Sequence, residues 1–267
     1  MAIVFRRRLH LPRRAAGSRV TQMTGTARCV FPELLDELPP DDPRARRSRR
    51  DLQRVHYAMA TLSILRHALG RLQLATPPRR ILELGAGDGT LLLRLARALQ
   101  PRWTGVELIL LDRHDIVAPE TREAYLQLGW RVTVARTEVL AWAQKSITQR
   151  YDLCVATLFL HHFDDSSLRV LLPAVAARTN AFVACEPRRD WFARLGSRLV
   201  GIIGGNDITR EDAVTSVAAG FANLELTTLW PRADRAWVID EFPARPFTHC
   251  FVAGRAETPK LGSAHVR

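Results

Sequence analysis

The sequence predicts an α/β fold in which a doubly wound, mostly parallel sheet of seven strands, with an antiparallel last strand, follows an N-terminal helical extension. Two observations support this prediction. Short apolar runs alternate with helical stretches from Ile81 to Cys185, and such alternation needs crossover connections between parallel strands. A turn with three glycines also follows the first apolar run, which is typical of sheets that bind a ligand at their carboxyl edge.

The region before the sheet divides into a basic arm and a helical cover. Residues 1–30 are rich in arginine and show no apolar periodicity, so we expect a poorly ordered arm. From Arg49 to Leu72 apolar residues recur every three or four positions, which predicts one amphipathic helix. We therefore expect residues 31–78 to form an N-terminal helical cover.

Residues 79–257 form the predicted main domain, and residues 258–267 form a tail. The strands and helices expected before its last two strands are, in chain order, Ile81 to Leu84, Thr90 to Leu99, Val106 to Leu111, Pro119 to Leu128, Arg131 to Ala135, Val139 to Gln149, Tyr151 to Thr157, Ser166 to Arg178 and Ala181 to Cys185. Leu224 to Leu229 and Thr248 to Ala253 then have strand character and are separated by a long loop, which predicts an antiparallel hairpin at one edge of the sheet.

Composition indicates an ordinary globular protein. The 267 residues are 47% hydrophobic and 25% charged, enough for one large core. The apolar runs are too short for a membrane span, and the N-terminus lacks the features of an export signal, so neither is expected. The four cysteines stand far apart, which favours buried thiols in the cytoplasm.

The formal net charge of +12 raises the question of a nucleic-acid partner. Almost every cation is arginine, since Lys145 and Lys260 are the only lysines, and this skew is typical of a coding bias. Much of the excess charge also lies in the first fifty-four residues. We therefore do not expect a nucleic-acid partner, although binding of a polyanion by the basic arm stays an alternative.

The glycine-rich turn lies where the first strand gives way to a helix. Gly85, Gly87 and Gly89 stand at alternate positions, and glycine allows both a tight turn and close approach of a ligand to the backbone. Dinucleotide-binding folds use a related turn, but their spacing is G-x-G-x-x-G and not the G-x-G-x-G found here.

With Glu83 two residues before it, the turn resembles the S-adenosylmethionine (SAM) motif of class I methyltransferases, E/D-x-G-x-G-x-G. The resemblance extends from about residue 79 to 255 and implies a Rossmann-like fold, an enzyme, and SAM as its cofactor. It implies that Glu83 and the three glycines hold the methionine end. Asp112 would then accept hydrogen bonds from the ribose, and Glu138, or alternatively Thr137, would lie near the adenine. A nucleotide-binding oxidoreductase is the main alternative.

The segment from Thr157 to Phe163 ends the fourth strand and resembles the corresponding segment of small-molecule methyltransferases. We place Thr157 among the cofactor contacts. Methyl transfer to a phenol, with a pKa near ~10, gains from a base, and histidine is the usual choice. Because side chains alternate in direction, we expect only one of His161 and His162 to face the acceptor, and we predict His161 as the base. The alternative is that both cap the next helix or bond backbone carbonyls.

Five further residues are predicted to line the acceptor pocket on weaker signals: His56 and Tyr57 on the cover, His162, and Arg188 and Asn206 after the fifth strand. Each has an ordinary alternative. The histidine on the cover suits a surface position, the arginine could pair with a neighbouring acid, and the asparagine could form a turn.

The function that these features imply is O-methylation of a phenolic or polyketide-like secondary metabolite. C-methylation of a quinone-like ring, an RNA methyltransferase that uses the basic arm, and a degenerate fold that only binds are the alternatives. No carboxylate and histidine group has metal-ligand spacing along the chain, so the sequence predicts metal independence. A homodimer is left open.

Overall fold

The structure, a computed structural model, describes residues 27–231 and 237–256. Most of the predicted arm and all of the predicted tail lie outside the described residues. One seven-stranded sheet runs in the order β3-β2-β1-β4-β5-β7-β6. Its strands are β1 (Arg80–Leu84), β2 (Glu107–Asp112), β3 (Arg131–Arg136), β4 (Tyr151–Thr157), β5 (Thr179–Pro187), β6 (Trp237–Ala244) and β7 (Thr248–Arg255).

The sheet confirms the predicted doubly wound topology. Strands β1 to β5 pair in parallel, and β7 is antiparallel to both of its neighbours, β5 and β6. The chain reverses its winding direction between β1 and β4, which are neighbours in the sheet although two strands separate them in sequence. In open α/β sheets such a switch point leaves a crevice at the carboxyl ends of the strands, where ligands bind.

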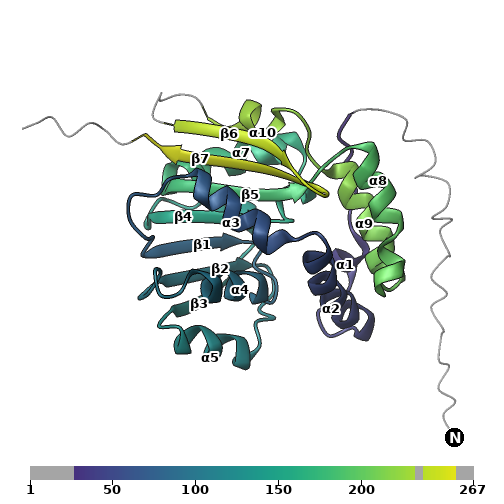
Figure 1. The fold of residues 1–267 in the computed structure, drawn as a ribbon, viewed down its shortest axis with the longest axis horizontal. Helices are drawn as coiled ribbons and strands as arrows, with labels where there is room; N and C mark the ends of the chain where they lie inside the picture. The colour runs from purple at the N-terminus through teal and green to yellow at the C-terminus, as the bar shows by residue number, and fades with distance from the viewer. Residues whose placement is uncertain (1–26, 232–236, 257–267) are drawn as a thin grey trace, which may run out of the picture.

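Helices cover both faces of the sheet, as Figure 1 shows. On one face α3 (Thr61–Arg71), α4 (Thr90–Leu99) and α5 (Pro119–Gln127) pack on inward-facing side chains such as Ile81 and Leu108. The other face is covered by α6 (Val139–Gln144), α7 (Asp165–Arg178) and α10 (Glu225–Leu229), which pack on side chains such as Leu82 and Ala156. The alternation of neighbouring strand residues between the two cores follows from the two-residue repeat of a β-strand.

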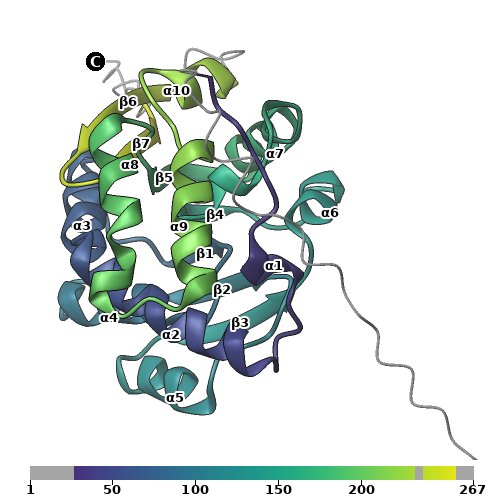
Figure 2. The same ribbon diagram turned by 90° about the vertical axis from the view of Figure 1, so that its right-hand side faces the viewer.

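A separate group of helices gathers beyond the carboxyl edge of the sheet (Figures 1 and 2). It consists of α1 (Leu34–Glu37) and α2 (Pro43–Ala58) from the N-terminal region, with α8 (Trp191–Arg198), the 3₁₀ helix η4 (Val200–Ile203) and α9 (Asp207–Ala219) from the β5–β6 connection. The cover therefore has two halves, and only the N-terminal half was predicted from the sequence.

The predicted single helix from Arg49 to Leu72 is two helices with different roles. The break lies at Met59 and Ala60, and Ala60 has a left-handed backbone with φ of 53°. Because of this break, α2 extends over the carboxyl edge of the sheet, whereas α3 packs on the sheet itself. An apolar repeat of three to four residues can continue across a one-residue bend, so periodicity alone did not reveal it.

The first strand of the predicted C-terminal hairpin is wrong, because Glu225–Leu229 forms the helix α10 and the partner of β7 is β6. The carboxylate of Glu241, on β6, accepts hydrogen bonds from the backbone N–H groups of Leu226 and Thr227. These two bonds satisfy backbone N–H groups at the N-terminus of α10. The short apolar pattern of this segment did not distinguish a helix from a strand. The predicted antiparallel edge hairpin itself is present.

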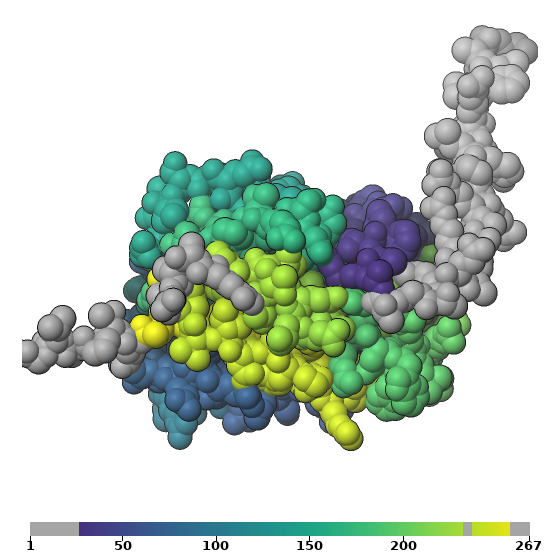
Figure 3. Space-filling model, turned by 90° about the horizontal axis from the view of Figure 1, so that it is seen from above, coloured from purple at the N-terminus to yellow at the C-terminus, as the bar shows by residue number. Residues whose placement is uncertain are grey.

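The predicted arm does not extend as far as residue 30. Arg28 donates a 2.6 Å hydrogen bond to the carbonyl of Phe163, forms an ion pair with Asp165, and lies over the ring of Phe221. Figure 3 shows the start of the described chain, in purple, packed beside the green helices at one end of the molecule. Residues 27–30 are thus part of the folded domain.

Two simpler expectations concern thiols and membrane spans. Cys154, Cys185 and Cys250 are buried free thiols, as predicted, and Cys29 is half-buried. Among the described residues, no helix combines the length and the apolar character needed to cross a bilayer.

Candidate active site

The glycine-rich turn connects β1 to α4 and has a backbone that other residues rarely adopt. Gly85, Gly87 and Gly89 all have positive φ values, between 55° and 71°. The N–H of Gly87 donates a 2.9 Å hydrogen bond to Oδ2 of Asp112, which ties the turn to the end of β2. A side-chain methyl placed at Gly87 would meet no atom within 4 Å, so the turn faces open space at this position.

Two buried polar side chains beside the turn lack partners within the protein. Glu83, on β1, is 4% exposed, and its Oε2 accepts no hydrogen bond. Burial, with the nearby charges of Asp88 and Asp112, raises the pKa of Glu83 well above its usual value. The hydroxyl of Thr157, at the end of β4, also lacks a partner. Buried polar groups without partners are costly, which indicates that a ligand satisfies them.

The two other acids predicted to contact a cofactor lie at the carboxyl edge of the sheet, as Glu83 and the glycine-rich turn do. Asp112 ends β2, and its carboxylate accepts hydrogen bonds from Gly87 and from the N–H of His114. Glu138 precedes α6 but makes no capping hydrogen bond with that helix, whereas the neighbouring Thr137 donates to a backbone carbonyl. Both Thr137 and Glu138 line the cavity described next, so the geometry accommodates either one.

One cavity of about 620 Å³ joins these residues to the helical cover. This volume lies within the range of roughly 300–1,000 Å³ that is usual for small-molecule sites. Its floor includes Glu83, Gly87, Asp112 and Thr157 at the carboxyl edge of the sheet. Its walls come mainly from the cover, with Phe247 from the turn between β6 and β7, and include the apolar side chains of Leu52, Val55, Met59, Leu199, Val200 and Ile203.

His161 lies on this cavity wall, in the short 3₁₀ helix η3 (Leu160–His162) that follows β4. Its Nδ1 is 2.8 Å from Oε2 of Glu186, a fully buried residue on β5. The same carboxylate accepts hydrogen bonds from the backbone N–H groups of Phe159, Leu160 and His161. Glu186 therefore determines both the start of η3 and the orientation of the His161 ring.

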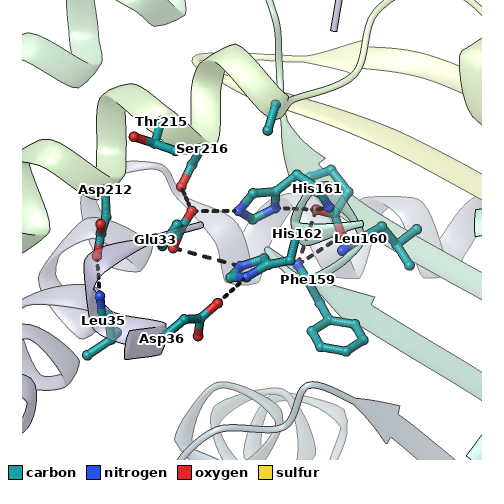
Figure 4. Close-up of polar contacts among 12 residues, drawn as sticks. Glu33, Leu35, Asp36, Phe159, Leu160, His161, His162, Asp212, Thr215 and Ser216 are labelled. Carbon is teal, nitrogen blue, oxygen red and sulfur yellow. Dashed lines mark hydrogen bonds and ion pairs between the residues drawn. The ribbon is translucent and has the colours of Figure 1, made fainter. Parts of the chain in front are cut away.

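Glu33, immediately before α1, joins the two histidines (Figure 4). Its carboxylate lies 3.3 Å from Nε2 of His161 and 3.8 Å from Nε2 of His162, and it also accepts a short hydrogen bond from Ser216. Nδ1 of His162 is in turn 2.9 Å from Asp36. We call Glu33, His161 and His162 the histidine–glutamate cluster. One ligand atom from each of the three lies within 4.8 Å of the others.

Electrostatics in the histidine–glutamate cluster favours charged groups. Burial alone would lower the pKa of His161, but hydrogen bonds and ion pairs with Glu186 and Glu33 outweigh it and raise this pKa to about 9. Burial would likewise raise the pKa of Glu33, yet its contacts with His161 and His162 lower it. At neutral pH His161 is therefore protonated and held between two carboxylates.

A third cavity histidine, His56, has the opposite character. Burial lowers the pKa of His56 to about 4, so its ring is neutral at physiological pH. Its Nδ1 lies 3.3 Å from the hydroxyl of Thr61. The predicted position of His56 in the pocket lining agrees with the cavity, because α2 presents it on the same wall as Val55 and Met59.

Three residues predicted to line the pocket lie elsewhere. Tyr57 is 78% exposed and borders a separate surface pocket between α2 and α4. Arg188 forms a 2.7 Å ion pair with Asp190. Asn206 caps α9 by accepting a hydrogen bond from the N–H of Thr209. The ion pair of the arginine is the ordinary alternative that the sequence left open, whereas the asparagine begins a helix and does not form the turn suggested as its alternative.

The carboxylates that organise the histidine–glutamate cluster were not predicted from the sequence. Glu33 and Asp36 come from the N-terminal cover, and Glu186 comes from β5. Asp212, on α9, accepts hydrogen bonds from the N–H groups of Leu34 and Leu35 and so anchors α1 beside the cluster. Of these carboxylates, Glu186 had a local signal in the sequence, because it lies near the end of a strand as Asp112 does.

No protein-family model matches the sequence, and no curated protein matches it either. Solved structures do match. The plantazolicin methyltransferase BpumL in complex with SAH is 14% identical with a TM-score of 0.58, and the match covers 81% of this chain and 92% of that one. The plantazolicin methyltransferase BamL, in complex with a triazolic desmethylPZN analog and SAH, is 11% identical with a TM-score of 0.57, and the match covers 83% of this chain and 93% of that one. The pyocyanin biosynthetic protein PhzM is 18% identical with a TM-score of 0.51, and the match covers 81% of this chain and 60% of that one.

These likenesses confirm the predicted fold class. The chain has the Rossmann-like α/β fold of the class I methyltransferases, with the seven-stranded sheet and its antiparallel strand β7. At identities below one fifth, the shared feature is the fold. The activity has to be argued from the site itself.

Proposed function

We propose that this protein is a methyltransferase that transfers a methyl group from SAM to a hydroxyl oxygen of a small, largely apolar acceptor. The observation that supports this proposal is the single cavity that holds both the glycine-rich turn with its acids and the histidine–glutamate cluster. A cofactor bound at the floor and an acceptor bound against the wall would share one enclosed space. Much of the catalysis of methyl transfer comes from positioning the cofactor and the acceptor against each other in this way.

The residues of the cavity floor fit SAM. Gly87 leaves open space where a backbone can approach the cofactor closely, and the unpaired Oε2 of Glu83 can accept a hydrogen bond from its ammonium group. Asp112 is available to the ribose hydroxyls and Glu138 or Thr137 to the adenine. When bound, SAM supplies a methyl group already activated by a sulfonium. The complexes of the similar plantazolicin methyltransferases with SAH support this choice.

The cavity walls indicate the class of acceptor. Aliphatic side chains of α2 and η4 and the ring of Phe247 line the cavity, which suits an aromatic or polyketide-like molecule. The histidine–glutamate cluster also lines the cavity, and there a hydroxyl can be bound and can lose its proton. This combination favours a phenol over an acceptor that has no acidic proton.

We propose His161 as the residue that takes up this proton. Glu186 holds its Nδ1, so Nε2 is the atom available for proton transfer. In the described structure Nε2 faces Glu33, and an acceptor hydroxyl therefore reaches His161 only by displacing that contact. The contact with Glu33 is one of the causes that raise the pKa of His161, so its displacement by the acceptor lowers this pKa and favours the neutral imidazole that a base requires.

The proposal is tested with purified protein, SAM, and a panel of phenols, naphthols and hydroquinones, with SAH release as the readout. We expect micromolar SAM binding by calorimetry and turnover on a phenol. Use of SAM with a ¹³C-labelled methyl group and NMR of the product distinguishes a methyl ether from a ring methyl group. Absence of SAM binding by the folded protein would refute the proposed function.

His161→Gln tests the base. We expect kcat to fall by about a hundredfold or more, the usual contribution of general base catalysis. His249→Gln is the matched control, because His249 is also buried and lies 2.8 Å from a carboxylate, that of Glu241, but does not line the cavity. A loss below about fivefold in His161→Gln, with circular dichroism unchanged, would remove His161 from this role.

A further inference from the structure

We infer that the histidine–glutamate cluster binds a divalent transition-metal ion. The carboxylate of Glu33 lies 3.3 Å from Nε2 of His161 and 3.8 Å from Nε2 of His162, and one ligand atom from each residue lies within 4.8 Å of the others. In a tetrahedral site with bonds of about 2.0–2.1 Å, ligand atoms stand roughly 3.3–3.4 Å apart. The three side chains therefore need only small rotations to bind one ion.

The far side of each imidazole is already held as metal-bound histidines require. Nδ1 of His161 is 2.8 Å from Glu186, and Nδ1 of His162 is 2.9 Å from Asp36. Metal-binding histidines usually donate this second ring N–H to a carboxylate, which fixes the tautomer and leaves the other nitrogen as the ligand atom. Here the two remaining nitrogens both point toward Glu33 (Figure 4).

The charges around the histidine–glutamate cluster also suit a dication. Three carboxylates contact the two imidazoles, from Glu33, Asp36 and Glu186. Among the described residues that ion-pair with these carboxylates, Arg113, 2.7 Å from Asp36, is the one permanent cation. Binding of the ion would displace the proton that His161 otherwise carries, and with both imidazoles neutral, three negative charges and one positive charge leave a balance of two negative charges. A buried site with this balance is stabilised by a divalent ion.

The ligand set also indicates which metals fit. Two imidazoles and one carboxylate bind Zn²⁺, Co²⁺ or Fe²⁺, whereas Mg²⁺ prefers oxygen ligands in an octahedral arrangement. All three residues line the cavity, so the fourth coordination position of the ion would open toward the acceptor. This inference reverses the sequence-based prediction of metal independence. Glu33 is 128 positions away from His161 in the chain, which no spacing rule detects.

The metal site goes beyond the proposed methyl transfer and replaces one part of it. In the metal-loaded protein Nε2 of His161 would bind the ion and would not be the base, whereas in the metal-free protein it keeps the base role proposed above. An acceptor hydroxyl bound at the open position of the ion would have its pKa lowered by the metal. Binding of the ion can be measured without SAM or acceptor, so failure of this inference is distinguishable from failure of the proposed methyl transfer.

The test is calorimetric titration of the full-length, chelator-treated protein with Zn²⁺, repeated with Mg²⁺. We expect one equivalent of Zn²⁺ with micromolar or tighter affinity and no binding of Mg²⁺. Glu33→Gln and His162→Ala should each weaken Zn²⁺ binding by at least about a hundredfold. Asp36→Asn, which alters the support of His162 and the ion pair with Arg113 but none of the three proposed ligands, should weaken it by about 10- to 100-fold.

His114→Ala is the control, because His114 lines the same cavity but lies outside the histidine–glutamate cluster. It should bind Zn²⁺ as the wild type does. The visible absorption of added Co²⁺ gives a second readout, which should indicate four or five nitrogen and oxygen ligands in the wild type and change in His162→Ala. Equal Zn²⁺ affinity of wild type and His162→Ala, or no stoichiometric binding by the folded wild type, would overturn the inference.

Discussion

Substitution of Gly85 or Gly87 by alanine distinguishes the contribution of the glycine-rich turn to stability from its contribution to cofactor binding. Both have left-handed backbones, with φ of 66° and 55°. A Cβ at Gly85 would lie 2.0 Å from Cδ2 of the Phe159 ring, whereas a Cβ at Gly87 would meet nothing within 4 Å. Gly85→Ala must therefore displace a packed aromatic ring, and Gly87→Ala only forces alanine into an unfavourable backbone region.

The magnitudes follow from these two situations. Alanine in the left-handed region costs about 1–2 kcal/mol, partly offset by about 0.4–1 kcal/mol because alanine restricts the unfolded chain. Gly87→Ala should thus lower the free energy of unfolding by at most about 1.6 kcal/mol. Overpacking adds about 1–3 kcal/mol, so Gly85→Ala should lose about 1–4.6 kcal/mol.

Urea unfolding and calorimetry with SAM measure the two effects. We expect Gly85→Ala to have a clearly lower unfolding midpoint than Gly87→Ala. Gly87→Ala should stay folded but lose SAM affinity, because its methyl group projects into the cavity. Adding Phe159→Ala should remove most of the penalty specific to Gly85→Ala. Equal stability losses in the two single variants would refute the packing argument, and wild-type SAM affinity in Gly87→Ala would refute the role of the turn.

Three more predictions concern other parts of the molecule. Asp112→Ala should weaken SAM binding by about 10- to 100-fold in calorimetry, because a hydrogen bond to a charged acceptor is worth about 1.5–3 kcal/mol. Asp112→Asn should lose less affinity. An unchanged Kd in Asp112→Ala would exclude the ribose contact. Burial, and next the charge of Glu33, raise the pKa of Asp212 from 3.8 to about 7. The resulting stability is fully present below pH 3.8 and is lost as the pH rises through about 7. In urea unfolding the wild type should therefore lose stability relative to Asp212→Asn between pH 5 and pH 8, by at most about 3 kcal/mol. A difference that does not change with pH would contradict that shift. Deleting residues 1–26 should leave turnover on a phenol unchanged, whereas loss of activity, together with salt-sensitive RNA binding, would favour the RNA alternative.

The parallel part of the sheet could be predicted closely because its signals are local. The bounds of β4 and α4 agree with the apolar runs, and β1, β2 and β3 differ by one residue or so at their ends. A strand buried on both faces reads as a continuous apolar run, and the crossover helix after it repeats every three to four residues. The glycine-rich turn and the acid at the end of β2 are local in the same sense, since each follows a strand directly.

Elements whose partners are distant in sequence were harder to predict. The helix α10 depends on Glu241 of β6, and the bend between α2 and α3 depends on what each helix packs against. The helices α8 and α9 were not predicted, although Asn206 begins α9 with a capping hydrogen bond. Their packing against the N-terminal cover decides that they close the cavity, and no pattern within the β5–β6 connection contains that information.

The sequence by itself determined where a cofactor could bind, because the glycine turn, Glu83 and Asp112 occupy the carboxyl ends of neighbouring strands. It also singled out His161. Only the tertiary structure decided what surrounds that histidine, since Glu186 reaches it from the next strand and Glu33 from a segment 128 positions earlier. The physical reason is that hydrogen bonds and ion pairs act over a few ångströms in space, and folding alone brings these carboxylates that close.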